Sequence, residues 1–251
     1  MRGARTGDNP APHLLAAPGR ASGVVVGQRR VSDKSNEIPA LPDLLAPLDL
    51  DGALITADAM HTQRSTAQWI ISRGAHYLLT VKDNQPGLKR ELERLPWKDV
   101  PSTSVPDGSH GRRVRRTVQA VEAPAWIDFP GAAQVIRIRR TRTVKGRKHV
   151  EVVHLICSLP MDQAQPEAIA SWARGHWTIE NRLHWVRDVV FDEDRHQLRT
   201  ANGPQIMAAL RNLAISLIRL LHGPRAPIAA TTRAMARRPE RAIRLLTQPT
   251  T

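Results

Sequence analysis

The order of apolar and polar residues near the start of the chain predicts a β-hairpin followed by a helix. Apolar runs at 13–17 and 23–31 flank the turn sequence Pro-Gly-Arg at 18–20, which is typical of a hairpin. Farther on, apolar residues recur every three or four positions up to about Leu45, and this spacing predicts a short helix. These residues are Ile38, Leu41, Leu44 and Leu45.

The next part of the chain predicts a strand, a helix and a second strand at short intervals. An apolar run at 53–59 indicates a buried strand that carries the carboxylate Asp58 near its end. A helix is predicted over about 62–73, because Gly74 is suited to end it, and the second strand over 77–81. Strand, helix and strand in this order are typical of a parallel crossover, which puts the fold in the α/β class.

Three β-like runs rich in arginine follow a charged helix that ends near Arg94 and an irregular segment at 96–110. They lie within about 111–159, and we predict a β-rich insertion with a basic face. Alternation along a strand puts Arg137 and Arg139 on one face of it, where they would contact DNA phosphates. A solvated sheet face is the alternative interpretation of these charges.

The last third of the chain predicts helices. Pro166 suits the first position of a helix that should run to about Val189. A second long helix is predicted over about 204–221, where apolar residues recur at helical spacing. The final residues, 225–251, are rich in arginine and predict a basic, partly helical tail.

The composition of the chain favours one kind of binding partner and argues against several kinds of site and protein. Lysine and arginine number 37 against 23 acidic residues, a net charge of +14, which favours nucleic acid as a partner. A soluble protein from a GC-rich genome, in which arginine replaces lysine without functional cost, is the alternative interpretation. The single cysteine, Cys157, excludes an internal disulfide and a cysteine-based zinc site, and its apolar surroundings indicate a core residue.

No stretch has the roughly 18 apolar residues of a membrane span, and the start lacks a secretory signal pattern. A cytoplasmic protein without a membrane partner is the simplest interpretation.

The most informative motif occupies 176–194, His-Trp-Thr-Ile-Glu-Asn-Arg-Leu-His-Trp-Val-Arg-Asp-Val-Val-Phe-Asp-Glu-Asp. It puts the carboxylate Glu180 among two tryptophans, two histidines and two arginines on one predicted helix, which is rare in a purely structural helix. The run resembles the C-terminal signature of insertion-sequence transposases of the DDE class, in the subfamily of the H-repeat-associated proteins. Other matching patterns are Thr-Ala-Asp-Ala-Met-His-Thr-Gln at 56–63, Lys-Asp-Asn-Gln at 82–85, Asn-Gly-Pro at 202–204 and Leu-Arg-Asn-Leu-Ala at 210–214.

The resemblance covers roughly residues 2–222 and implies a fold and a chemistry. The expected fold is ribonuclease-H-like, a mixed sheet with flanking helices in a catalytic domain over 1–224 that the β-rich insertion interrupts. By motif, Asp58 is the second catalytic carboxylate and Glu180 the third, and they would share two divalent ions, magnesium or manganese, about 4 Å apart. The implied activity is cleavage of double-stranded DNA at the element ends and transfer of these ends to target DNA, by a homodimer.

Further residues of the predicted site would contact DNA. Lys82 and Asn84 follow a strand that is parallel to the strand of Asp58, so they should lie near the same edge of the sheet, where a DNA backbone would pass. Arg187 lies seven residues after Glu180, where related transposases have a basic residue that contacts the DNA backbone.

The sequence departs from the family pattern at its start. The family's first catalytic aspartate lies in an Asp-Gly-Lys segment shortly before an Arg-Gly pair, and here Arg2-Gly3 follows Met1 directly. We therefore expect either an incomplete and inactive copy without the first strand, or an open reading frame assigned from too late a start codon. A DNA-binding remnant without chemistry is the main alternative to a transposase, and a remnant that does not fold is a third.

Overall fold

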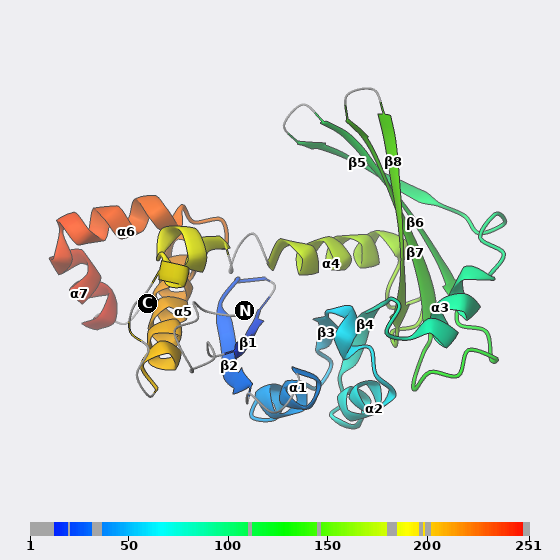
Figure 1. Cartoon of the computed structure of the whole chain (residues 1–251), viewed down its shortest axis with the longest axis horizontal. Helices are drawn as coiled ribbons and strands as arrows, with labels where there is room; N and C mark the ends of the chain where they lie inside the picture. The colour runs from blue at the N-terminus through cyan, green and yellow to red at the C-terminus, as the bar shows by residue number, and fades with distance from the viewer. Residues whose placement is uncertain are drawn as a thin grey trace. The chain divides into compact units, whose positions relative to one another are not determined.

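The structure is a computed structural model that describes residues 13–19, 21–31, 37–109, 112–144, 147–179, 185–195, 198 and 202–247. The chain divides into two compact units (Figure 1). Residues 48–176 form the sheet unit, and residues 1–47 together with 177–251 form the hairpin unit.

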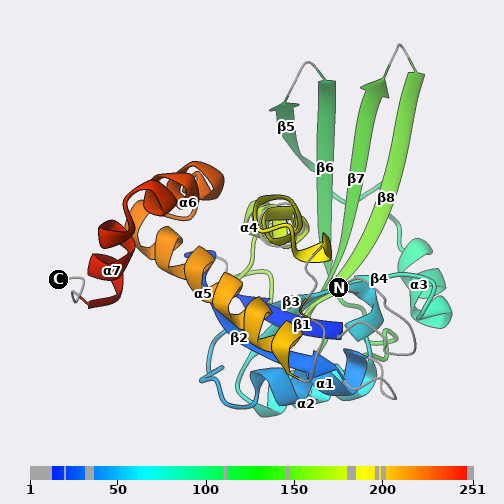
Figure 2. The ribbon, with the colours of Figure 1, turned by 60° about the vertical axis from the view of Figure 1, so that its left-hand side comes forward.

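The sheet unit is built on one mixed sheet, whose strands lie in the order β3-β4-β8-β7-β6-β5. β3 and β4 are parallel and are joined by helix α2, which confirms the predicted crossover. The other neighbouring strands are antiparallel, and Figure 2 shows β5 to β8 side by side. The strands are β3 (Leu54–Ala57), β4 (His76–Val81), β5 (Thr103–Ser109), β6 (Arg112–Glu122), β7 (Gln134–Val144) and β8 (Arg147–Cys157).

The predicted β-rich segment is continuous with the rest of this sheet. Leu78 of β4 pairs with Cys157 of β8, and the ladder continues through β7 to β6. These strands confirm the prediction of three β runs, but the prediction of an irregular segment at 96–110 is wrong, because Thr103–Ser109 forms β5. β5 lies at the end of this strand order, and edge strands are where proline is found in sheets, as Pro106 is here. Pairing with β6 over the whole length of β5 makes this segment a strand, and local composition does not reveal that pairing.

Helices α2 (Arg64–Ser72), α3 (Pro86–Glu93) and α4 (Pro166–Ile179) flank the sheet, with α3 and α4 on opposite sides of the strands in Figure 1. Side-chain alternation agrees with this placement. Gln134 of β7 donates hydrogen bonds of 2.7 and 3.1 Å to the carbonyl oxygens of Leu159 and Ala164, shortly before α4. Arg137, on the opposite face of β7, lies over the ring of Trp97, which follows α3. Among the fully buried core residues of the sheet unit are Tyr77, Leu79, Val135, Ile136 and Ile156.

His154 of β8 is a buried titratable group on the α3 side of the sheet. Its ring lies 5.8 Å from the ring of Trp97, and only 6% of the residue is exposed. Burial lowers the pKa of His154 below its usual 6.5; the positive charges of Arg137 and Lys89 lower it further, and Glu93 acts in the opposite direction. The native protein therefore binds a proton at His154 less readily than the unfolded chain does.

We expect the free energy of unfolding to fall on acidification from about pH 7.5 to about pH 5, and His154→Gln to flatten this slope. The sign follows because the unfolded state binds more protons once the pH falls below 6.5, so protons favour unfolding. Urea denaturation across this range measures the effect. His149→Gln, at an exposed histidine of the same strand, is the matched control and should keep the wild-type slope. Equal slopes in the two variants would show that His154 is not the acid-sensitive group.

The hairpin unit consists of a β-hairpin and several helices. β1 (His13–Pro18) and β2 (Val25–Val31) are antiparallel, as predicted, and helix α1 (Glu37–Leu45) follows them. Helix α5 (Gly203–His222) contacts β2 and the segment before it through polar groups. Ser216 Oγ accepts a 3.0 Å hydrogen bond from the amide of Val25, and Arg219 Nη1 donates one of 2.5 Å to the carbonyl of Gly23. Val186, Ile215, Ile218 and Ile228 form an apolar cluster in this unit.

The helices predicted for the last third of the chain are present with altered bounds. α5 confirms the second long helix. The helix expected from Pro166 to Val189 is described as α4 up to Ile179 and as a π-helical turn over Val186–Val190; residues 180–184 lie outside the described residues. The tail contains the two helices α6 (Ile228–Arg237) and α7 (Pro239–Thr247). In the part of the chain that the structure describes, no helix has the length and apolar character needed to cross a bilayer.

Candidate active site

Asp58 lies directly after the last residue of β3, so the predicted strand does end in a carboxylate. Its side chain is 79% exposed. A short 3₁₀ helix, Ala59–His61, begins after it, but the Asp58 side chain makes no capping hydrogen bond to that helix. An aspartate at this position usually caps the helix that follows it. The Asp58 side chain does not, so its carboxylate is available for other contacts.

The Asp58 carboxylate contacts one side chain from a distant part of the sequence, His176 of α4. The imidazole Nε2 lies 3.3 Å from Asp58 Oδ1, and the imidazole Nδ1 lies 3.2 Å from Thr56 Oγ1 on β3. The hydrogen bond from His176 is the largest cause that lowers the pKa of Asp58; partial burial opposes it, and the positive charge of Lys82 adds to it. Asp58 is therefore a carboxylate, and not a carboxylic acid, at neutral pH.

The loop after β4 lies beside the turn after β3. Asn84 Nδ2 donates a 2.6 Å hydrogen bond to the carbonyl oxygen of Ala59, the residue that follows Asp58. Thr62 Oγ1 donates another of 2.6 Å to the carbonyl oxygen of Thr80. Lys82 is exposed, and its charge contributes to the low pKa of Asp58. Parallel strands thus bring Asp58, Lys82 and Asn84 to one edge of the sheet, whereas the proposed contact of Lys82 and Asn84 with DNA stays a prediction.

Arg137 and Arg139 share one face of β7 but differ in their contacts. The guanidinium of Arg137 donates two hydrogen bonds, of 3.0 and 2.5 Å, to Gln119 Oε1 and lies 5.0 Å from the centre of the Trp97 ring. Arg139 is exposed. Of the two predicted phosphate contacts on this strand, Arg139 is therefore the more exposed, and Arg137 is partly buried and hydrogen-bonded to Gln119.

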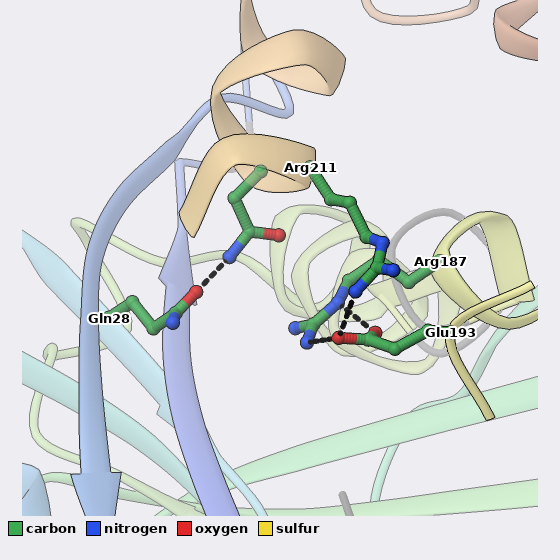
Figure 3. Close-up of polar contacts among 5 residues, drawn as sticks. Gln28, Arg187, Glu193 and Arg211 are labelled. Atoms are coloured by element: carbon green, nitrogen blue, oxygen red, sulfur yellow. Dashed lines mark hydrogen bonds and ion pairs between the residues drawn. The ribbon is translucent and has the colours of Figure 1, made fainter. Parts of the chain in front are cut away.

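Arg187, the third arginine of the predicted DNA contacts, is buried in the hairpin unit. Its side chain is 2% exposed, and its Nε and Nη2 each donate a 2.6 Å hydrogen bond to Glu193 (Figure 3). A phosphate could bind this guanidinium only by displacing Glu193. The contact of Arg187 with DNA stays a prediction that requires such an exchange.

Glu180, the predicted third carboxylate, lies outside the described residues. Within the residues that are described, no three histidine, cysteine or acidic side chains are grouped as metal ligands. The chemistry of the donors present nevertheless fits a hard divalent cation, because Asp58 offers an exposed, ionised carboxylate and magnesium is commonly held by one or two carboxylates with water. Cys157 does not compete as a nucleophile: it is fully buried, and burial raises the pKa of its thiol to about 11.

His176 is the functional candidate that sequence reasoning did not assign a role. It lies 118 residues from Asp58 in the sequence, so no local spacing connects the two side chains. The one feature of the sequence that could have indicated a functional role for His176 is its place four residues before Glu180, within the tryptophan-rich motif.

Comparison with known proteins identifies the relatives of this chain. The family model described as "Transposase DDE domain" matches residues 13–217. The "Putative transposase YncI" of Escherichia coli O157:H7 is 35% identical over 223 residues, which cover 83% of this chain and 56% of that protein. The "H repeat-associated putative transposase YhhI" of Escherichia coli (strain K12) is 32% identical over 223 residues, 83% of this chain and 58% of that protein. The chain thus spans a little over half the length of these curated relatives.

Among solved structures, the chain aligns with a "piggyBac transposase synaptic complex with hairpin DNA". The TM-score is 0.46 and the identity 13%, and the alignment covers 88% of this chain and 44% of that chain.

Proposed function

The chain belongs to the DDE transposase family, in the subfamily that includes the H repeat-associated putative transposases, and we propose that it carries catalytic residues for metal-dependent strand cleavage and strand transfer during DNA transposition. The proposal includes a ribonuclease-H-like catalytic domain over residues 1–224, followed by a basic tail at 225–251. The substrate is double-stranded DNA, the element ends and the target, and the acting form is a homodimer in the cytoplasm.

The observation that carries the proposal is the state of Asp58. The family motif makes it a catalytic carboxylate, and it is ionised, exposed and held by a histidine at the end of a strand. In α/β sheets, ligands bind in the crevice outside the carboxyl ends of the strands, and β3 ends at this position. A carboxylate with these properties can take part in cation binding without first losing a proton.

The proposed metal-binding residues are Asp58 and, by resemblance, Glu180. Two divalent ions, magnesium or manganese, would activate the attacking oxygen and stabilise the leaving oxygen of the phosphodiester. The chain's own contribution in the described part of the site is to hold the Asp58 carboxylate in place through His176. Lys82, beside that carboxylate, and Arg139 on β7 are proposed to contact the DNA backbone, and Asn84 holds the loop that carries Lys82.

A DNA-binding protein without chemistry is the second candidate function. The observation that favours it is the charge of the chain, +14, together with the exposed arginines of β7 and β8, which do not depend on the carboxylates. These exposed residues include Arg139, Arg142 and Arg147. Electrostatic contacts of this kind bind DNA independently of sequence and weaken as salt increases.

The test is nicking of DNA that carries the element's own ends, in magnesium or manganese, by the 251-residue chain and by Glu180→Ala. If the chain is catalytic, we expect cleavage that requires the metal and is lost in Glu180→Ala; such cleavage would contradict the expectation of an inactive copy. A version of the protein extended in frame upstream of Met1 to include an Asp-Gly-Lys segment, where the genome encodes one, is assayed beside these two proteins. If no version cleaves but the chain shifts DNA in a salt-sensitive way, the binding function holds and the catalytic proposal fails.

A further inference from the structure

We propose that His176 is a positioning residue for Asp58: its imidazole fixes one carboxylate oxygen, Oδ1, so that the other, Oδ2, is presented to a divalent cation. The inference rests on the proposed function, because it assigns a role to a neighbour of the proposed metal ligand. The structure places the imidazole between two groups of β3, Thr56 and Asp58. No hydrogen bond to Asp58 Oδ2 is found among the described side chains.

The two partners of His176 determine which nitrogen carries the proton. An ionised carboxylate only accepts hydrogen bonds, so Nε2 must carry a hydrogen to interact favourably with Asp58 Oδ1. A hydroxyl can donate as well as accept, so Thr56 Oγ1 can donate to the unprotonated Nδ1. The neutral imidazole thus satisfies both contacts only with its hydrogen on Nε2, and Thr56 favours that tautomer.

The geometry also restricts the motion of the carboxylate. The His176 side chain is only 16% exposed, whereas the Asp58 side chain is 79% exposed and would otherwise rotate in solvent. Because α4 carries the histidine and β3 carries both of its partners, the hydrogen bonds connect two elements far apart in the sequence. Hydrogen-bonding partners of this kind orient the metal ligands that they contact, and their loss commonly weakens metal binding by about 10- to 100-fold.

A direct ligand role for His176 is the competing arrangement. It requires the opposite tautomer, with Nδ1–H donating to Thr56 and the Nε2 lone pair on the metal, and in that state Nε2 no longer donates to Asp58. A spectroscopic measurement separates the two, since only a directly bound imidazole gives strong ¹⁴N coupling to a manganese ion.

The experiment is a Mn²⁺ titration of the full chain, followed by electron paramagnetic resonance, with ¹⁴N coupling recorded by pulsed methods. We expect His176→Phe to bind Mn²⁺ about tenfold more weakly, and His176→Gln, whose amide N–H can replace Nε2–H, to stay within about threefold of the wild type. The wild type should show no coupling to a directly bound nitrogen. His76→Gln, at a histidine at the start of β4, is the matched control and should leave Mn²⁺ affinity unchanged.

Three results would overturn the inference: wild-type affinity in His176→Phe, failure of His176→Gln to restore binding although it unfolds like the wild type, or strong ¹⁴N coupling in the wild type that His176→Phe removes. Asp58→Asn separates these results from failure of the proposed function. If Asp58→Asn loses Mn²⁺ while His176→Phe retains it, only the positioning role is wrong. If Asp58→Asn binds Mn²⁺ as the wild type does, Asp58 is not a ligand, and the metal site and the positioning role fail together.

Discussion

Replacing Glu193 with glutamine is expected to reduce the free energy of unfolding of the hairpin unit by about 3 to 5 kcal/mol, the range for breaking a buried ion pair by removing one partner. Glu193 accepts hydrogen bonds from two arginines at once: Arg187 at 2.6 Å through each oxygen, and Arg211 of α5 at 3.3 Å. The Arg187, Arg211 and Glu193 side chains are 2%, 7% and 12% exposed. Figure 3 shows both guanidinium groups directed at the one carboxylate.

The size of the effect comes from the charges that remain. Glutamine keeps the shape of glutamate but has no charge, so two buried guanidinium groups would face each other without an anion between them. Their mutual repulsion adds to the cost of keeping each of them away from water. The same unit holds a second polar contact, between Gln28 of β2 and Asn212 of α5, which does not involve Glu193 and should remain.

Urea denaturation measures the loss, and hydrogen exchange at the amides of α5 assigns it to the hairpin unit. Asp192→Asn is the matched control, because Asp192 is the adjacent acidic residue and its side chain is 61% exposed, 3.8 Å from Arg195. It should change the free energy of unfolding by less than about 1 kcal/mol, as is usual for an exposed ion pair. A loss in Glu193→Gln as small as that of the control would mean that the two arginines are solvated in solution and that the cluster is not buried.

The contact of Arg187 with Glu193 could not be predicted from spacing along the sequence. The resemblance to related transposases implied a phosphate contact for Arg187, but its partner Glu193 lies six residues later, a spacing that brings no two side chains together on a regular helix. Between the two residues the π-helical turn ends at Val190, and Asp192 has a φ of 48°, in the left-handed region, so the helix does not continue to Glu193. Aspartate adopts this conformation more readily than most residues, yet nothing in the apolar pattern predicts that it does so here.

Local patterns of apolar and polar residues were sufficient to predict those helices and strands that depend mainly on their own residues. The crossover from β3 to β4 and the helix α5 followed from apolar periodicity, and Asp58 was placed at its strand end correctly. The edge strand β5 and the contact between His176 and Asp58 depend on pairing and packing with distant segments, so neither was predicted. The same limit applies to Arg137. Its strand face was predicted correctly from alternation, but its hydrogen bonds are made to Gln119 on the neighbouring strand β6 and were not predicted.

Replacing Asp58 with asparagine is expected to lower the rate of metal-dependent DNA cleavage by about a thousandfold. Loss of a metal ligand removes several kcal/mol of transition-state stabilisation, and about 1.4 kcal/mol corresponds to a factor of ten. Asparagine has nearly the same shape as aspartate, so the β3 turn and the contact with His176 should persist. The measurement is a single-turnover rate on DNA with the element's ends, in whichever form of the protein cleaves, the 251-residue chain or its in-frame extension.

The control for this change is Asp83→Asn, in the loop after β4 at the same edge of the sheet. Asp83 is also exposed, and Lys89, at 2.7 Å, lowers its pKa, so the substitution removes an equivalent negative charge without touching Asp58. We expect Asp83→Asn to cleave at the wild-type rate. DNA affinity should be equal or slightly higher in both variants, because each loses one negative charge near the proposed path of the backbone. If Asp58→Asn cleaves as fast as Asp83→Asn, the metal is held by other carboxylates, and the exposed carboxylate at the end of β3 has no part in the chemistry.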